Sequence, residues 1–163
     1  MMKERVEYKM DKFDINILKN PEIFEQNRLP AHSDHIAYAT ENERISQETS
    51  LRENLNGLWK FAYAKNMAHA IDGFEKVDFD CHTWDDIRVP AHIQMEGYGN
   101  PHYTNTTYPW DAAEEINPGE IPEIFNPVAS YVKYFTVPKR MEGKRIVISF
   151  QGGGKRICIV AQR

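Results

Sequence analysis

Apolar and polar side chains alternate from Leu58 onward, and this alternation constrains the fold more than any other feature. Trp59, Phe61 and Tyr63 fall on one face of an extended chain, and Lys60 falls on the other. A period of two is the pattern of a β-strand that has one face against a core and one face toward solvent. The segment therefore predicts a half-buried strand.

Three further segments have strand patterns, and the connections between them are rich in proline. The strand segments are 87–89, which Pro90 ends, 131–137 and 144–150, with a polar turn over 138–143. A long connection passes through five prolines from Pro101 to Pro127. Short strands, such connections and the lack of an amphipathic helix longer than two turns predict an all-β sandwich.

The first fifty residues predict an irregular extension with one short helix. Asn20 can cap that helix, Pro21 suits its first position, and Glu22 and Glu25 favour its positive end. Residues 67–71 predict a second brief helical turn within the strand-rich part.

Charge and composition exclude several classes of function. The chain has 20 Lys and Arg against 24 Asp and Glu without a basic run, so we expect no nucleic-acid partner. No apolar stretch approaches the roughly 20 residues of a membrane span, and the first residues carry charge where a signal peptide is apolar. Two cysteines, Cys81 and Cys158, form no C-x-x-C pair. We therefore expect a cytoplasmic protein that makes no contact with a membrane.

Six motif blocks stand in a fixed order along the chain. The longest, at 101–110, is P-H-Y-T-N-T-T-Y-P-W, and it follows V-P-A-H-I-Q-M-E-G-Y-G at 89–99. The others are N-R-L-P-A-H-S at 27–33, L-N-G-L-W-K-F at 55–61, Asn126-Pro127 followed by Tyr131, and V-I-S-F-Q-G at 147–152. Together they resemble the amino-terminal sugar-binding domain of the β-galactosidases of glycoside hydrolase family 2, over roughly residues 20 to 152.

The resemblance implies a jelly-roll β-sandwich over 51–152, incomplete at its carboxyl end. It implies that the complete enzyme hydrolyses terminal β-D-galactosides, lactose among them, by a retaining mechanism. The family's paired carboxylates and its magnesium ligands belong to a barrel beyond this chain, so we expect the fragment to be inactive alone. Magnesium and sodium are implied for the complete enzyme, which is expected to be a homo-oligomer.

Asn105 is the main candidate for contact with the sugar, because the resemblance implies that the Asn of Y-T-N-x-T-Y-P hydrogen-bonds galactose hydroxyls. A carboxamide both donates and accepts, so it can bind a pair of hydroxyls without adding charge. The alternative is an Asn that satisfies the backbone of its own turn. Thr106 is a second candidate for the same pocket.

Several carboxylates could be considered as catalytic residues, but a surface position explains them more simply. The carboxylates Asp85-Asp86, Glu114-Glu115 and Glu96 have the pattern of a solvated surface, so we expect no catalytic residue among them.

Histidines and tryptophans are also candidates for ligand contact. His32 and His35 have a metal-like spacing but no third ligand nearby, so we expect no metal site. Trp59, Trp84 and Trp110 could stack on sugar faces, although the alternation assigns Trp59 to the core and leaves Trp110 undecided.

Residues 153–163 depart from the family pattern, which continues with a strand of the type F-x-L-W-L-N-G. Residues 157–163 read I-C-I-V-A-Q-R, which ATT TGC ATT GTG GCT CAA CGG can encode. Shifted by one base, these letters encode F-A-L-W-L-N-G. We therefore expect a tail translated out of frame after a frameshift; the alternative is a natural divergent tail.

Two rival functions remain open. One is a free-standing carbohydrate-binding or assembly module without catalysis, and a downstream reading frame that encodes the barrel would decide against it. The other is a different activity on the same architecture, such as β-glucuronidase, which the galactosidase-like form of Y-T-N-x-T-Y-P disfavours.

Overall fold

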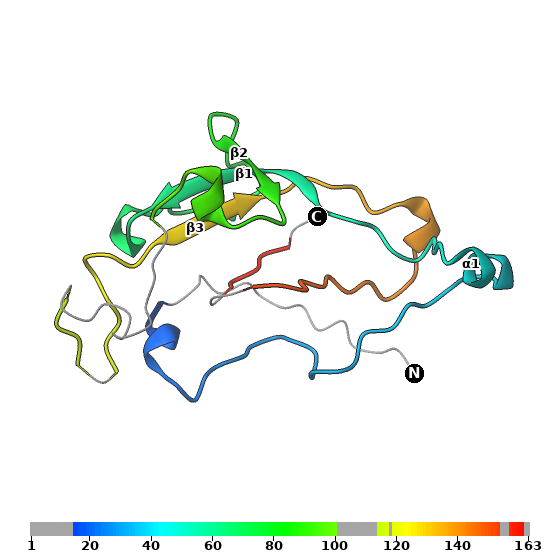
Figure 1. The fold of residues 1–163 in the computed structure, drawn as a ribbon, viewed down its shortest axis with the longest axis horizontal. Helices are drawn as coiled ribbons and strands as arrows, with labels where there is room; N and C mark the ends of the chain where they lie inside the picture. Colours follow the sequence, from blue (N-terminus) through cyan, green and yellow to red (C-terminus); the bar gives the residue numbers. More distant parts are fainter. Residues whose placement is uncertain (1–14, 101–113, 118, 154–156, 162–163) are drawn as a thin grey trace.

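The computed structural model describes residues 15–100, 114–117, 119–153 and 157–161, and its centre is one antiparallel sheet (Figure 1). The sheet has three strands in the order β2-β1-β3. The strands are β1 (Gly57–Ala64), β2 (Asp85–Val89) and β3 (Val128–Val132). The all-β class expected from the sequence is therefore confirmed.

Phe61 lies at the centre of this sheet. It is opposite Asp85 on β2 and opposite Tyr131 on β3, so strands flank it on both sides. Trp59 is opposite Ile87 on the same face, and Phe61 and Ile87 are each 1% exposed. Phe61 is buried and Trp59 and Tyr63 are half-buried on this face, as the alternation predicts, although Ala64 on the other face is buried too.

Within the described residues, helical structure is confined to short pieces. The α-helix α1 spans Glu41–Ser46, and four 3₁₀ turns span Ile15–Lys19 (η1), Met67–His69 (η2), Ile93–Glu96 (η3) and Lys139–Met141 (η4). The turn η2 confirms the brief helical excursion expected over 67–71. Among the described residues, no helix has both the length and the apolar composition needed to cross a membrane.

The short helix of one or two turns expected after Asn20 is a single hydrogen-bonded turn in the structure. Asn20 does cap, since its Oδ1 accepts from Glu22 N at 2.9 Å, but the bond from Ile23 N to Asn20 O closes a single turn that does not propagate. The helix of this region is α1, where Thr40 Oγ1 accepts from Glu43 N at 3.2 Å and the Glu43 carboxylate accepts from Ala39 N at 2.8 Å. This is the reciprocal arrangement of a capping box, displaced by one residue.

Two predicted strands need correction. The strand expected at 131–137 is β3, which begins at Val128 and ends at Val132, and the segment 144–150 pairs with no other described strand. Arg140 of η4 donates from Nε to Ser50 O at 2.7 Å and pairs with Glu53 at 2.6 Å. Figure 1 shows η4 near α1, away from the sheet. The polar turn expected over 138–143 is therefore fastened near α1 and not beside the sheet, and 144–150 joins no described ladder.

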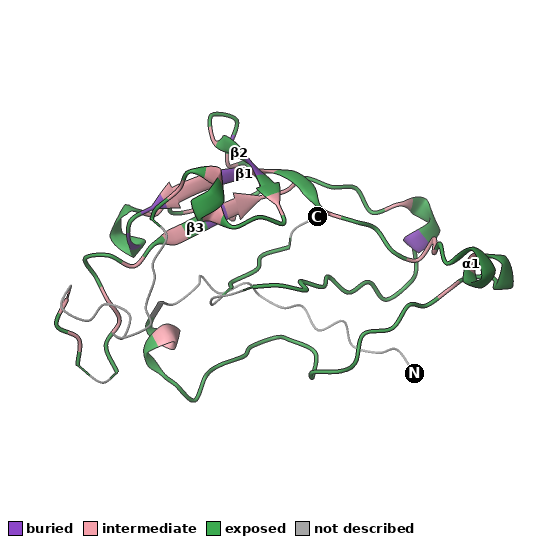
Figure 2. Ribbon diagram, in the orientation of Figure 1, coloured by how far each residue is buried: buried purple, intermediate pink, exposed green. Residues whose placement is uncertain are grey.

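A large apolar surface lies outside the core. The apolar residues of 144–150 are 41–53% exposed on both alternating faces: Ile146, Val147, Ile148 and Phe150. The chain exposes 14665 Å², whereas a compact monomer of 19.0 kDa exposes about 8400 Å². Figure 2 shows burial gathered at the sheet, its adjoining turns and η4.

Candidate functional site

The sugar-contact candidates Asn105 and Thr106 lie outside the described residues, as does Trp110. The structure describes the residues that lead into the 101–113 segment and those that follow it. These two flanks, which we call the amino anchor and the carboxyl anchor, therefore define the candidate site.

The amino anchor begins where β2 ends. A cis peptide joins Val89 to Pro90, the turn η3 follows, and Gly97 ends it with φ of 95°, a left-handed conformation that suits glycine. The N–H of Tyr98 then donates to Ile93 O at 3.0 Å. This turn reverses the chain, so that Tyr98 returns to the aromatic face of the sheet.

Tyr98 is held on that face by its ring and by its hydroxyl. The ring centroid lies 4.5 Å from that of Phe61 and 6.1 Å from that of Tyr63. The hydroxyl donates to Asp85 Oδ2 at 2.8 Å. This hydrogen bond, followed by burial and the charges of Asp85 and Glu96, raises the pKa of Tyr98 to about 12.

Gly99 lies against the hydroxyl of Tyr63. A Cβ at Gly99 would lie 3.0 Å from Tyr63 Oη, and the φ of Gly99 is 67°. Both the contact and the conformation favour glycine at this point. The G-Y-G motif therefore has a structural role in bringing the chain across β1.

A second contact ties η3 to β2. Arg88 donates to Glu96 Oε1 from its NH2 group at 2.8 Å and from Nε at 3.2 Å. The hydrogen bonds and the negative charge of Glu96 raise the pKa of Arg88. Since Arg88 is largely exposed, this ion pair orients the turn more than it stabilises the fold.

The carboxyl anchor begins at Glu114. Its carboxylate accepts from Glu123 N at 2.7 Å and from Ile124 N at 3.1 Å. The carbonyls of the same two residues accept from Asn66 Nδ2, at 2.7 Å for Glu123 and 3.2 Å for Ile124. The N–H of Asn126 donates to Lys65 O at 3.0 Å. The segment that follows the motif is thus fastened to the residues directly after β1.

Both anchors therefore lie on one strand and its continuation. The amino anchor contacts Phe61 and Tyr63, and the carboxyl anchor contacts Lys65 and Asn66. Sequence reasoning treated G-Y-G only as a landmark and gave Asn66 no role. Asn66 follows closely after a strand, and an Asn at such a position often caps the next turn through its side chain. This pattern could have identified Asn66.

The carboxylates considered for catalysis have structural partners. Asp85 accepts from Tyr98, and Asp86 pairs with Lys60 Nζ at 3.1 Å. Glu96 pairs with Arg88, and Glu114 accepts backbone amides. Each of these four groups has a geometry that explains it without a reaction.

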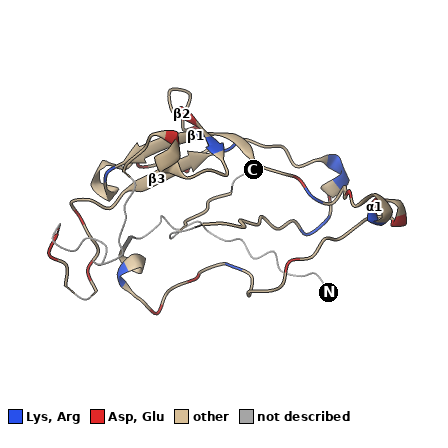
Figure 3. Ribbon diagram, viewed as in Figure 1, with Lys and Arg blue, Asp and Glu red and all other residues tan. Residues whose placement is uncertain are grey.

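The described residues do not fit a metal ion. They contain no group of three or more His, Cys, Asp and Glu side chains close enough to hold one. His32 Nδ1 lies 2.9 Å from Pro30 O, and His35 Nδ1 lies 3.4 Å from Ser33 O. In Figure 3, acidic and basic residues are interspersed along the described part of the chain, apart from η4, which carries Lys139 and Arg140.

The two described tryptophans belong to packing clusters. Trp59 donates from Nε1 to Leu55 O at 2.8 Å, and its ring lies edge-on to Tyr131. Trp84 packs against Phe74 and Phe79, with ring centroids 5.7 and 5.5 Å away. Trp59, expected in the core, is half-buried at its edge.

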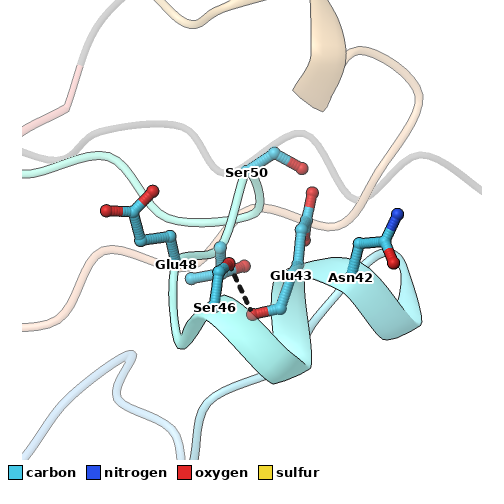
Figure 4. A pocket seen from close by; sticks show the side chains of 6 residues that line it. Asn42, Glu43, Ser46, Glu48 and Ser50 are labelled. Atoms are coloured by element: carbon cyan, nitrogen blue, oxygen red, sulfur yellow. Dashed lines mark hydrogen bonds between the residues drawn. The ribbon is translucent and has the colours of Figure 1, made fainter.

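A shallow polar hollow of about 450 Å³ lies beside α1 (Figure 4). Ser46 Oγ donates to Glu43 O at 3.2 Å. A hydrogen bond from Ser50, followed by the N–H of Ala39, lowers the pKa of the Glu43 carboxyl. The hollow is remote from the sheet in Figure 1, and its central carboxylate serves the helix cap. We assign it no ligand.

The described residues form one antiparallel sheet, and a long motif-bearing connection is anchored to it on both sides. The profile of the glycosyl hydrolases family 2, sugar binding domain, matches residues 52–159, and the chain belongs to this family. The resemblance drawn from the six motif blocks is thereby confirmed.

Similar proteins share this region. The chain is 50% identical over 140 residues to a protein of Halalkalibacterium halodurans named beta-galactosidase, covering 85% of this chain and 14% of that protein. It is 43% identical over 143 residues to the beta-galactosidase of Clostridium acetobutylicum, covering 87% and 16%. It is 36% identical over 151 residues to the beta-galactosidase large subunit of Latilactobacillus sakei, covering 85% and 24%. The chain thus spans between a seventh and a quarter of the length of these relatives.

Proposed function

We propose that this chain is the amino-terminal sugar-binding part of a β-galactosidase, and that the complete enzyme hydrolyses terminal non-reducing β-D-galactose residues of lactose-type substrates. The observation that carries the proposal is the Y-T-N-T-T-Y-P motif, which lies inside the family match and between two anchors, one on β1 and one on the residues directly after it. A segment that is anchored at both flanks can hold a ligand-binding side chain in a defined orientation.

Asn105 is the proposed ligand contact, with Thr106 beside it. The Asn105 carboxamide would accept from one galactose hydroxyl and donate to another, which selects a sugar without introducing charge. Its contribution is orientation of the substrate; it supplies neither the proton nor the nucleophile.

The reaction itself requires groups from the rest of the enzyme. Retaining hydrolysis needs an acid and a nucleophile about 5 to 5.5 Å apart on either side of the glycosidic bond. Four of the five carboxylates considered above, Asp85, Asp86, Glu96 and Glu114, are engaged in anchors and ion pairs, so we propose that the chain alone is inactive. Magnesium and sodium, implied for the complete enzyme, are assigned no ligand in this chain.

The cellular setting and the assembly complete the proposal. We place the protein in the cytoplasm, a location supported by two free cysteines, one buried and one exposed, which suit a reducing compartment. The proposed partners are a β-galactoside, the remainder of the enzyme and further copies of it.

The test uses a chimera in which the matching 140 residues of the Halalkalibacterium halodurans protein are replaced by those of this chain. In the chimera, Asn105→Ala should remove a hydrogen bond worth about 0.5 to 1.5 kcal/mol, which lowers kcat/KM about two- to tenfold. The loss should shrink for the deoxygalactoside that lacks the contacted hydroxyl. The Asn54→Ala variant, at an exposed residue, is the control.

Two results would overturn the proposal. Equal losses for all substrates together with a lower melting temperature would assign Asn105 to the scaffold of its own segment. A well-folded chimera without β-galactosidase activity, beside a chain that binds galactosides alone, would favour a free-standing carbohydrate-binding module.

A further inference from the structure

Asn56 is the only asparagine of the chain that is followed by glycine. Both residues are exposed, and no hydrogen bond within the described part of the chain uses the Asn56 side chain. A Cβ at Gly57 would meet no heavy atom within 4 Å, so no other segment crowds this residue. Since glycine itself has no Cβ, the Asn56 carboxamide can approach the amide nitrogen of Gly57.

The linkage between these residues lies at the end of the sheet. Gly57 is the first residue of β1, and it is opposite Val89, the last residue of β2. Its φ of 118° belongs to a region that favours glycine. The end pair of a ladder opens at little cost, so the backbone here can change conformation while the rest of the sheet stays folded. Such an opening brings the Gly57 nitrogen within reach of Asn56 Cγ.

We propose that the linkage between Asn56 and Gly57 is a site of spontaneous deamidation in the folded protein. The Gly57 amide nitrogen loses its proton and attacks Asn56 Cγ, so that a bond forms between them and the bond from Cγ to Nδ2 breaks. The leaving nitrogen takes up one proton and departs as ammonia, and a succinimide ring remains. Water then adds to one of the two ring carbonyls and breaks its bond to the Gly57 nitrogen, which regains a proton. The only co-reactant is water, and nothing is oxidised or reduced.

The two ways of opening the ring give different backbones. Attack of water at Cγ gives aspartate, whereas attack at the main-chain carbonyl gives isoaspartate, in which the backbone runs through Cβ and is one carbon longer. Trp59 Nε1 donates to Leu55 O at 2.8 Å, and this hydrogen bond spans the linkage. Isoaspartate therefore changes the backbone path between the partners of that bond, and either product adds a negative charge beside the start of β1.

Asn54 is a control within the same molecule. It is exposed too, but its Oδ1 accepts from Asn56 N at 2.9 Å, and the next residue is Leu55. The Leu55 side chain crowds the amide nitrogen that would have to attack. Trypsin cleaves after Arg52 and Lys60, so both asparagines fall in one peptide, 53–60, whose fragment masses distinguish them.

The test incubates the folded chimera at mildly alkaline pH beside a synthetic peptide of residues 53–60, and then follows the tryptic peptide by mass spectrometry. Deamidation replaces NH2 by OH and raises the mass, and an isoaspartate-specific methyltransferase identifies the longer backbone. A sample digested without incubation measures the conversion that occurs during digestion. We expect Asn56 in the chimera to convert within about tenfold of its rate in the synthetic peptide, because the end of a ladder opens at little cost. Asn54 should convert much more slowly.

The matched variant is Asn56→Gln, which keeps a carboxamide but would have to close a larger ring. It should abolish the mass increase of the peptide. Conversion of the synthetic peptide without conversion of the folded chimera would overturn the proposal, because the fold would then protect the linkage. Equal conversion at Asn54 and Asn56, or a mass increase that persists in Asn56→Gln, would overturn the assignment of the site to Asn56 and Gly57.

Discussion

The rings of Tyr98 and Phe61 lie 4.5 Å apart, centroid to centroid, at an angle of 63°, although Tyr98 belongs to the connection after β2 and Phe61 to the middle of β1. Edge-on contacts at this distance are favourable because the positive edge of one ring faces the negative face of the other. The start of the motif-bearing connection is thus packed on the most buried ring of the core.

Phe61→Leu should weaken the packing of the motif-bearing connection on β1. Leucine keeps an apolar side chain but removes the ring contacts with Tyr98 and Tyr131, and each aromatic pair contributes about 0.5–1.5 kcal/mol beyond its burial. We expect a lower melting temperature of the chimera. Leu58→Ala, at a side chain that is 60% exposed, should change it little. Equal shifts for the two variants would contradict the central role of Phe61.

Tyr98 also predicts a dependence of stability on alkaline pH. Its pKa is about 12 in the fold and 10.0 in the unfolded chain, so the fold favours the neutral phenol. This contribution is fully present below about pH 10 and is lost as pH rises toward 12. The stability of the chimera should fall less steeply over this range in Tyr98→Phe, because phenylalanine does not titrate.

Tyr38→Phe is the control for this titration, because its hydroxyl bonds to the neutral Gln47 side chain at 3.3 Å. It should keep the steep loss of stability. If the free energy of unfolding falls equally steeply with pH in Tyr98→Phe and Tyr38→Phe between pH 10 and 12, the hydrogen bond to Asp85 does not raise the pKa of the Tyr98 phenol.

The elements that were predictable from the sequence are those with local causes. The alternation of Trp59, Phe61 and Tyr63 fixes β1, because side chains on successive strand residues point to opposite faces. The segment 144–150 has an equally strong pattern but no ladder, because a strand needs a partner and the Arg140 contacts hold its turn away from β3. Such a long-range contact has no periodic pattern.

The candidate site was predictable only in part. The motif identifies the family, and its Asn105 and Thr106 remain predictions, since no described contact involves them. Asn66 caps η2, a local role that its place just after β1 could have indicated, but its bonds to Glu123 and Ile124, 57 and 58 positions away, follow no local pattern. T-E-N-E at 40–43 is a capping-box pattern from which α1 could have been predicted, although the helix of this region was expected after Asn20.

The chain expressed alone should aggregate or form a molten state. The buried apolar residues among those described are Phe61, Ala64, Cys81, Ile87 and Met141, while Ile146, Ile148 and Phe150 are exposed. A stable domain is favoured by about 5 to 15 kcal/mol, and uncovered apolar surface forgoes about 25 cal/mol per Å². We expect dye binding and weak near-ultraviolet circular dichroism. A monodisperse sample with a sharp cooperative melting transition would contradict this expectation.

The last prediction concerns the gene. Residues 157–161 pair with no described strand, and Ile157, Ile159 and Val160 are 40–53% exposed. The family match ends at residue 159, within the segment for which we predict a shifted frame. The shifted frame would supply F-A-L-W-L-N-G, whose Phe and two Leu alternate as a half-buried strand requires.

Sequencing the locus should reveal a one-base change near the codons for Gly152 to Gly154, or an adjacent frame that continues the family domain. If the next few hundred bases encode nothing similar to a family 2 hydrolase in any frame, the tail is a divergent end of the protein and the frameshift is excluded.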